Sequence, residues 1–229
     1  MSTNYPPLAF AKAISDKVNA AWEDGSFLEN VTPTTQNLLK YWFDPAYIDL
    51  RDVNFHEGQR QAIMNIIYIH EILKKDKILD VYSEIAPQLL LEPGSDLRVL
   101  GDKFYNYPKY CVKMATGTGK TWVLEALLIW QYLNARHEEG NYTKNFLIVA
   151  PGLIVYDRLL DAFLGRNKDN GESRDFETSD LKRQQDLFIP ENYRNEVFGF
   201  LQSSVAAKTE IGSKVTGDGI IAITNFHLL

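Results

Sequence analysis

The chain has a single cysteine, Cys111, among its 229 residues, so it cannot form an intrachain disulfide. This usage is typical of a reducing compartment. The sequence also lacks an apolar run of membrane-spanning length, and its first residues, MSTNYPPLAF, lack the basic-then-apolar order of a signal peptide. We therefore expect a cytoplasmic protein that does not contact a membrane.

An excess of basic charge is absent as well, because 24 Lys and Arg residues stand against 30 Asp and Glu residues, a net charge of −6. This balance argues against broad wrapping onto nucleic acid, although a local basic groove stays compatible with it. With 45% hydrophobic residues, the chain can bury a core as one large domain or two small ones. The histidines have no metal-ligand spacing with the lone cysteine, so we expect no zinc site.

Three regions are expected along the chain. Residues 1–75 form a helical N-terminal region, since threonines precede the apolar residues of TPTTQNLLKYWF and the isoleucines of HEGQRQAIMNIIYIHEILKK recur at helical spacing. The aromatic residues of KYWF are expected in the core. Residues 76–108 form an insertion or connecting subdomain with a turn at LEPGSD. Residues 109–229 make up the third region.

The third region alternates apolar strands with helices. The expected strands are Tyr110–Met114, Asn145–Pro151 and Ile220–Thr224, and the expected helices are GKTWVLEALLIWQYLNARH and VYDRLLDAFL. Continuous apolar strands separated by helices predict an α/β fold, with a parallel sheet covered by helices on both faces. The charged stretch GRNKDNGESRDFETSDLKRQQD is expected to be a solvated loop.

The stretch KYCVKMATGTGKTW places a glycine-rich loop between an expected strand and an expected helix. Such a loop directs backbone N–H groups into one concavity at a helix N-terminus, which suits a di- or triphosphate better than a simple helix cap. Lys120 would reach the β- and γ-phosphates, and the Thr121 hydroxyl would join the coordination shell of Mg²⁺. Met114 occupies a position where the strict pattern has glycine, but TGTGKT is intact. The expected nucleotide-binding residues are Thr116, Gly117, Thr118, Gly119, Lys120 and Thr121.

The base of the nucleotide needs a different recognition element. Gln59, in NFHEGQRQAI, offers a donor and an acceptor that match N6 and N7 of adenine, and Phe55 could pack beside the base. The alternative is an ordinary, exposed glutamine at the start of a helix.

An acidic partner for the phosphate loop is missing. Phosphoryl transfer needs an acid at a second strand end for Mg²⁺ and a group that orients the attacking water. The apolar strands end in Ala-Pro-Gly and Thr-Asn, no Asp-Glu dipeptide occurs, and Asp80 precedes the loop. We therefore expect the chain to be the first part of a longer protein whose catalytic acid follows Leu229, and to hydrolyse little ATP on its own.

The segments KMATGTGKTWVLEALLIWQYLN, KNFLIVAPGLIVYDRL, DLFIPENYR and IIAITNFHLL resemble the restriction (Res) subunits of type III restriction-modification systems, which are superfamily 2 DEAD/DEAH-type helicases or translocases. FHEGQRQAIMNIIYIHEI looks like their upstream glutamine motif. The resemblance runs from about Leu38 to the end and is weakest between Asp76 and Pro108. It implies a RecA-like P-loop domain that uses ATP and Mg²⁺, with Lys120 and Thr121 as catalytic residues. The Asp-Glu box, a second RecA-like domain and an endonuclease domain would follow.

The resemblance also implies two partners, double-stranded DNA and a modification (methyltransferase) subunit. Ligands of open α/β sheets lie at the carboxyl ends of strands, where backbone amides and basic residues such as Lys113 contact phosphates without reading bases. The DNA-contacting residues implied are Pro151, Gly152 and Arg158, with Thr224 and Asn225 near the DNA path.

Two other functions stay open. A P-loop kinase or other phosphotransferase predicts an acid at a strand end inside the chain and an arginine-rich lid. A non-catalytic nucleic-acid-binding module predicts that wild type and Lys120→Ala give equal, weak ATP binding.

Overall fold

The computed structural model describes residues 6–91, 107–168, 173–214 and 216–226. It divides into two compact units, Met1–Gln36 with His56–Thr118, and Asn37–Phe55 with Gly119–Leu229. The chain passes from the first unit to the second inside the glycine-rich loop, between Thr118 and Gly119, and the three expected regions stay a prediction. Each unit is therefore described by itself.

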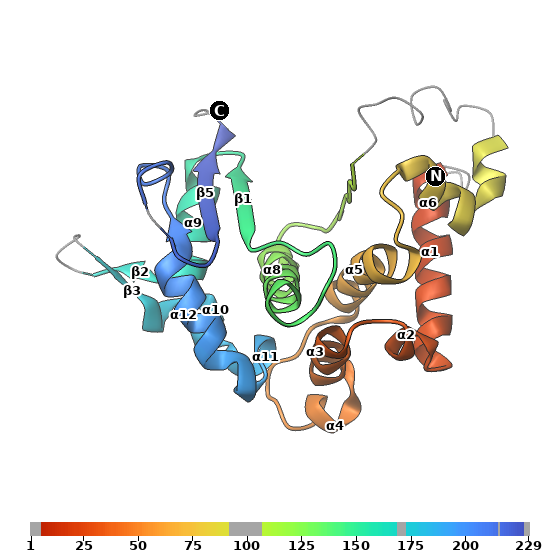
Figure 1. Cartoon of the computed structure of the whole chain (residues 1–229), viewed down its shortest axis with the longest axis horizontal. Helices are drawn as coiled ribbons and strands as arrows, with labels where there is room; N and C mark the ends of the chain where they lie inside the picture. Colours follow the sequence, from red (N-terminus) through yellow and green to blue (C-terminus); the bar gives the residue numbers. More distant parts are fainter. Residues whose placement is uncertain (1–5, 92–106, 169–172, 215, 227–229) are drawn as a thin grey trace. The chain divides into compact units, whose positions relative to one another are not determined.

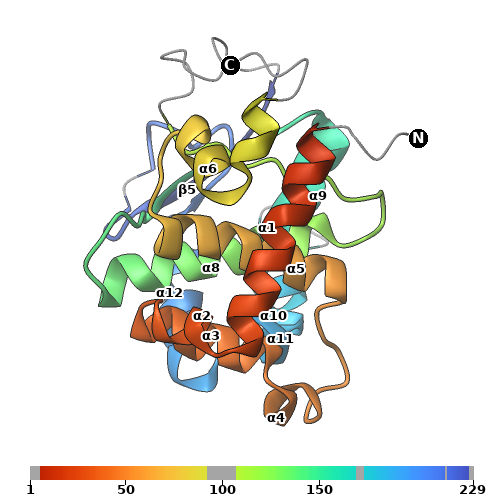
Figure 2. The ribbon, with the colours of Figure 1, turned by 90° about the vertical axis from the view of Figure 1, so that its right-hand side faces the viewer.

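The first unit is helical. Helix α1 packs against α5 and α6 (Figure 2), and buried aliphatic side chains from α1 and α5 supply its core. The helical periodicity expected after residue 56 is confirmed, although the helix changes to π geometry in its last turns. The elements are α1 (Pro6–Glu23), α2 (Ser26–Glu29), the first turn of α3 (Pro33–Phe43), α5 (Glu57–Ile67), the π-helix η1 (Tyr68–Leu73), α6 (Ile78–Ile85) and the 3-10 helix η2 (Pro87–Leu91).

The start of α3 is capped as the threonines predict. The Thr32 hydroxyl accepts a hydrogen bond from the Thr35 backbone N–H at 3.1 Å, which satisfies a donor of the first turn. The carboxylate of Glu71, in η1, is only 4% exposed and accepts from the Thr32 backbone N–H at 2.9 Å and from the Thr35 hydroxyl. A buried carboxylate is therefore held by the residues that open α3.

The second unit contains the sheet. Its three strands are parallel and lie in the order β1-β5-β4, with Asn145 paired to Ile220 and Ala150 paired to Asn225 (Figure 1). A separate antiparallel pair joins β2 and β3. The strands are β1 (Asn145–Ala150), β2 (Arg166–Asn167), β3 (Arg174–Asp175), β4 (Val205–Ala206) and β5 (Ile220–Asn225). The helices are the rest of α3, α4 (Pro45–Ile48), α8 (Lys120–His137), α9 (Leu153–Leu164), η4 (Phe176–Thr178), α10 (Asp180–Arg183), α11 (Gln185–Phe188), η5 (Glu191–Tyr193) and α12 (Arg194–Ser204).

The short segment Asn37–Phe55 belongs to the second unit because it contacts α11. Trp42 is fully buried and its indole N–H donates to the Phe188 carbonyl at 2.9 Å. Arg51 donates to the carbonyls of Trp42 and Leu187, both at 3.2 Å, and desolvation on burial lowers the pKa of its guanidinium. The expected core position of the KYWF aromatics is thus confirmed for Trp42 and Phe43, while Tyr41 is half-buried.

Three expectations about the third region are wrong. Tyr110–Met114 forms no strand. A strand requires a hydrogen-bonded neighbour. Tyr110 and Val112 also gain little burial, since both are exposed. Strand β1 is not covered on both faces, because Leu147 is 60% exposed and Val149 is 40% exposed. The charged stretch after α9 is not a plain loop, since it holds β2, β3 and short helices. The result is a mainly helical chain with a small parallel sheet.

Other expectations from the sequence are confirmed or fall outside the described residues. The strands expected near residues 145–151 and 220–224 are confirmed as β1 and β5. The helices expected in GKTWVLEALLIWQYLNARH and VYDRLLDAFL are confirmed as α8 and α9. The turn expected at residues 92–96 lies outside the described residues. Among the helices that the structure describes, none is long and apolar enough to cross a membrane.

Candidate nucleotide-binding site

The glycine-rich loop adopts the backbone geometry that its glycines predict. Gly117 and Gly119 have φ angles of +82° and +69°, in the left-handed region that disfavours side chains. The Thr118 backbone N–H and hydroxyl both donate to the Ala115 carbonyl, at 3.4 and 2.7 Å, and close a turn around Gly117. A Cβ added to Gly117 would meet nothing within 4 Å. The loop is thus an exposed turn with open space beside its backbone.

The second half of the loop begins α8, an 18-residue helix with Gly119 as its N-cap. Lys120 is exposed at the first helical position, and Thr121 follows it half-buried. Among the described residues no side-chain cap is seen at this helix start, and a helix N-terminus carries partial positive charge. This arrangement fits a phosphate group on the backbone side of the loop, with a lysine and a hydroxyl next to it.

The first half of the loop is joined to the glutamine motif within the first unit. His56 is the N-cap of α5, and its Nδ1 accepts from the N–H groups of Gly58 and Gln59 at 3.0 and 3.3 Å. On the other side of the ring, Nε2–H donates to the Thr118 carbonyl at 3.0 Å. A histidine that sequence reasoning treated only as a possible metal ligand therefore contacts the glycine-rich loop.

The two residues expected at the adenine have structural partners of their own. The Gln59 side chain is 2% exposed, and its Oε1 accepts from the His56 backbone N–H at 3.0 Å, completing a capping box. Phe55 is half-buried, with its ring 6.1 Å from that of Trp42 and 5.6 Å from that of Phe188. Gln59 thus lies at the start of a helix as the alternative predicts, but it is buried and not exposed, and adenine recognition by either residue stays a prediction.

A carboxyl group on α8 has no hydrogen-bond partner in the part of the chain that the structure describes. Glu125 is fully buried, and both of its carboxyl oxygens lack a partner among the described residues. Burial raises the pKa of this carboxyl well above its usual value, and the charge of Asp180 raises it further. On the same face of the helix, Trp122 meets Phe188 edge-on at 5.8 Å and Tyr132 stacks on Phe200 at 3.9 Å. Glu125 therefore lies between two aromatic contacts, in surroundings that favour the neutral form of its carboxyl.

The carboxyl ends of the parallel strands gather several of the residues expected at DNA. Pro151 is exposed and Gly152 half-buried after β1, and Arg158 is exposed on α9. Thr224 and Asn225, at the end of β5, are only 4% and 3% exposed. Their role at DNA stays a prediction, but such burial suits support of the edge better than direct phosphate contact.

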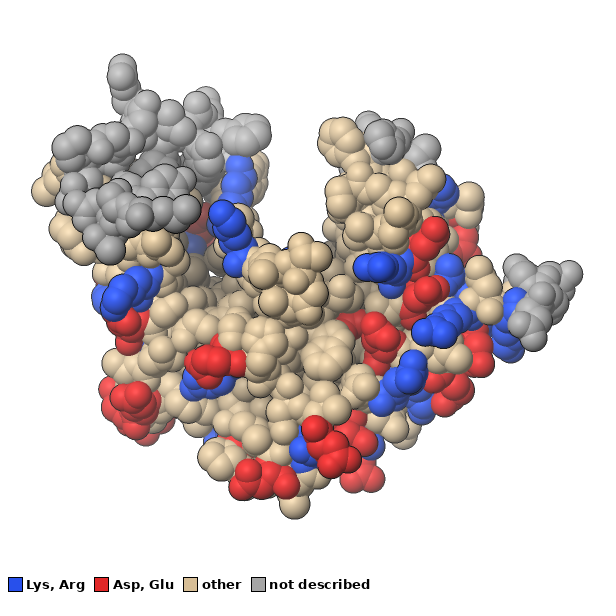
Figure 3. All heavy atoms as spheres, turned by 180° about the vertical axis from the view of Figure 1, so that it is seen from behind, with Lys and Arg blue, Asp and Glu red and all other residues tan. Residues whose placement is uncertain are grey.

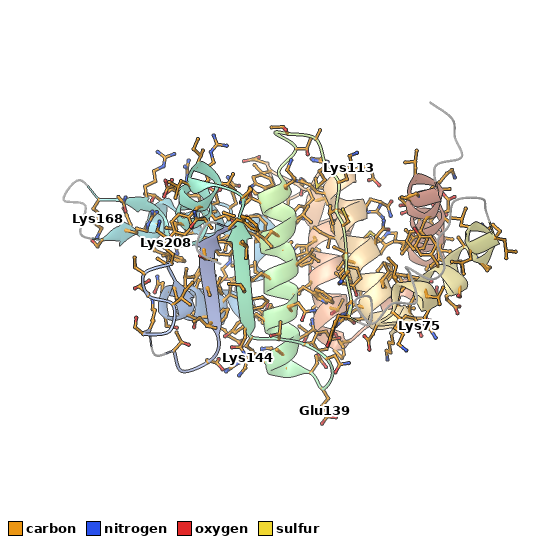
Figure 4. All side chains as sticks on the ribbon, turned by 90° about the horizontal axis from the view of Figure 1, so that it is seen from above. Lys75, Lys113, Glu139, Lys144, Lys168 and Lys208 are labelled. Carbon is orange, nitrogen blue, oxygen red and sulfur yellow. The ribbon has the colours of Figure 1, made fainter. Side chains whose placement is uncertain are left out.

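One further basic residue lies at this edge and was missed from the sequence. Lys208, labelled in Figure 4, follows β4. Its backbone N–H donates to the Tyr156 hydroxyl at 3.1 Å, and its ammonium lies 5.2 Å from the centre of that ring. The ring of Tyr156, on α9, thus holds the Lys208 ammonium at this edge of the sheet. The sequence SSVAAKTE carries no signal for such a role, because the contact depends on the pairing of β4 with β5.

Other basic residues lie beside acidic ones. Lys144, labelled in Figure 4, lies just before β1. It pairs with Asp218 at 2.7 Å, and this hydrogen bond lowers the pKa of Asp218. The face seen in Figure 3 intersperses basic with acidic side chains over the residues that it colours. Among the described residues no group of three or more His, Cys, Asp or Glu side chains is arranged to hold a metal ion.

The comparison with known families agrees with the family that the glycine-rich loop and its flanking motifs indicate. Residues 52–219, which are more than half of the chain, match the family model described as type III restriction enzyme, res subunit. The chain belongs to this res subunit family. The resemblance seen in the sequence is thus confirmed, and res subunits carry helicase-like superfamily 2 domains that typically use ATP. No curated protein matches the chain significantly, and no solved structure does.

Proposed function

We propose that this chain is the ATP-binding part of a DNA translocase or helicase of a type III restriction-modification system, built on a RecA-like core. The observation that carries the proposal is the glycine-rich loop, which joins two left-handed glycines to the start of an 18-residue helix in a chain of the res subunit family. Bound ATP would supply the phosphate chain whose hydrolysis drives movement along DNA.

The residues of the loop divide the work of binding. Backbone N–H groups around the two glycines would hold the phosphates, and Lys120 would neutralise charge at the β- and γ-phosphates. The Thr121 hydroxyl would take one position in the shell of a Mg²⁺ ion. The remaining oxygen ligands that this ion prefers would come from the phosphates, from water and from an acid on another segment.

Replacing Lys120 with alanine tests the nucleotide site. Loss of a charge-assisted contact, worth about 1.5–3 kcal/mol, should weaken binding of a fluorescent ATP analogue with Mg²⁺ by roughly ten- to hundred-fold. Fluorescence anisotropy of the full 229-residue chain measures this. Lys168→Ala, at an exposed lysine after β2, is the matched control and should bind like wild type. Equal, weak binding by wild type and Lys120→Ala would instead favour the non-catalytic nucleic-acid-binding module.

We further propose that the partners are double-stranded DNA, met at the carboxyl edge of the sheet, and a modification subunit that recognises the methylation site. Contacts at this edge would come from amides after Pro151 and from the side chains of Arg158 and Lys208, and they would reach phosphates and not bases. A restriction system meets DNA in the cytoplasm, so we expect the protein there.

DNA binding should accordingly be weak and should fall steeply as salt rises. Each phosphate contact adds about −0.9 to the slope of log K against log salt, so Arg158→Ala and Lys208→Ala should each make the slope shallower by about one. Titrations of a labelled duplex between 50 and roughly 200 mM salt measure this. Lys12→Ala, on α1 of the other unit, serves as the control. Binding that is selective for sequence and insensitive to salt would contradict this edge as a phosphate contact surface.

A further inference from the structure

The imidazole of His56 is locked in one tautomer by its contacts. Because Nδ1 accepts two backbone N–H groups, it carries no proton, so the ring proton is on Nε2. That proton points to the Thr118 carbonyl at 3.0 Å. Both ring nitrogens are therefore engaged, one with the start of α5 and the other with the glycine-rich loop.

The carbonyl that His56 holds belongs to the peptide that ends at Gly119. No described peptide bond is cis, and in a planar trans peptide the C=O and N–H groups point in opposite directions. Fixing the Thr118 carbonyl toward His56 therefore turns the Gly119 N–H away from the imidazole. Backbone N–H groups of this loop are the groups that would meet phosphate, so their direction determines how well the loop is prepared for it.

We propose that His56 is a positioning residue for the nucleotide site: it orients the Thr118–Gly119 peptide and couples the glutamine motif to the glycine-rich loop. The role rests on the proposed ATP-binding function of the loop. His56 does not touch the nucleotide itself. It further reduces the freedom of a glycine-flanked peptide, so that less of this freedom has to be lost when phosphate binds.

Two substitutions separate this role from simple capping of α5. His56→Ser keeps a side chain that accepts from the first-turn N–H groups and, with Gln59 three residues on, retains a capping box, but it cannot reach Thr118. His56→Gln is a poorer cap, yet its longer side chain keeps an amide N–H for the Thr118 carbonyl. His56→Ser thus keeps the cap of α5 and loses the contact with Thr118, whereas His56→Gln weakens the cap and keeps the contact.

The measurement is the affinity of the full chain for a fluorescent ATP analogue with Mg²⁺, beside the thermal unfolding midpoint of each variant. His56→Ser should bind the analogue roughly three- to ten-fold more weakly, the loss expected for one neutral hydrogen bond, while its midpoint stays close to that of wild type. His56→Gln should bind more tightly than His56→Ser in spite of a lower midpoint. A merely structural role would make affinity follow the midpoint in both variants.

Lys120→Ala in the same experiment distinguishes the two ways of failing. If Lys120→Ala weakens binding but His56→Ser binds as wild type does, the positioning role is wrong and the nucleotide site stands. If His56→Gln binds no more tightly than His56→Ser, the positioning role is likewise overturned. If the wild type shows no Lys120-dependent binding, the proposed function fails and the positioning role fails with it.

Discussion

Replacing Glu125 with methionine should stabilise the chain by about 1–3 kcal/mol at neutral pH, the usual cost of burying a polar group without a hydrogen bond. The carboxyl is fully buried on α8 and neither oxygen has a partner among the described residues. Methionine is unbranched, favours helices and fills a similar space without polar atoms. Urea unfolding followed by tryptophan fluorescence gives the free energy of unfolding.

The gain should depend on pH in a defined direction. Burial raises the pKa of Glu125 in the folded chain above its ordinary value of 4.5, so the unfolded chain loses this proton first as pH rises. Stability from the neutral acid is therefore complete below about pH 4.5 and is lost progressively above it. The difference between Glu125→Met and wild type should be smallest near pH 4 and should grow toward pH 8.

Two further variants serve as controls for the effect of Glu125→Met on the free energy of unfolding. Glu125→Gln keeps an unpartnered polar group but cannot ionise, so it should remove the pH dependence and recover less stability than methionine. Glu139→Met, at an exposed glutamate after α8, should change the free energy of unfolding by less than about 0.5 kcal/mol. A loss of stability in Glu125→Met at pH 7 would show that the carboxyl has a stabilising partner.

Replacing Trp42 with alanine should destabilise the second unit by about 3–5 kcal/mol, the range for large aromatic residues in a core. The indole is fully buried, meets Phe43 and Phe55 at ring distances of 6.1 Å each, and donates to the Phe188 carbonyl. Its removal leaves a cavity and takes a hydrogen-bond donor from that carbonyl. The same urea titrations measure the loss.

Trp42→Phe is the matched variant, because it keeps a ring and removes only the N–H and part of the volume. It should cost clearly less than alanine, about 1–3 kcal/mol. Tyr47→Ala, at an exposed aromatic residue of the neighbouring α4, should have a small effect. If Trp42→Ala unfolds like wild type, Asn37–Phe55 is not anchored through this indole.

Local features of the fold follow well from the sequence. The Thr32 cap of α3 and the glycines that precede α8 each depend on neighbours a few residues away, and the positions of β1 and β5 follow from their continuous apolar runs, although the strands themselves pair across the sheet. The same holds for the loop, because left-handed glycines at a helix start are encoded within TGTGKT. Family membership could also be recognised there, since it rests on short motifs.

Features that depend on contacts between distant residues could not be predicted from the sequence. The failed strand at Tyr110–Met114 has the right residues, but a strand exists only where a partner strand is available. The buried state of Glu125 was not foreseen, because α8 is apolar on nearly all sides and burial depends on what packs there. The contacts of His56 with Thr118 and of Lys208 with Tyr156 join residues more than fifty positions apart, a separation that no periodicity reveals.

The π-helix η1 has a consequence for how this chain tolerates insertions and deletions. A π turn carries one more residue than an α turn, and one residue amounts to about 100° of rotation around a helix axis. Deleting any residue between Tyr68 and Glu71 would regularise the turn but swing the carboxylate away from the two threonines that it binds. In this segment the number of residues is therefore as constrained as their chemistry.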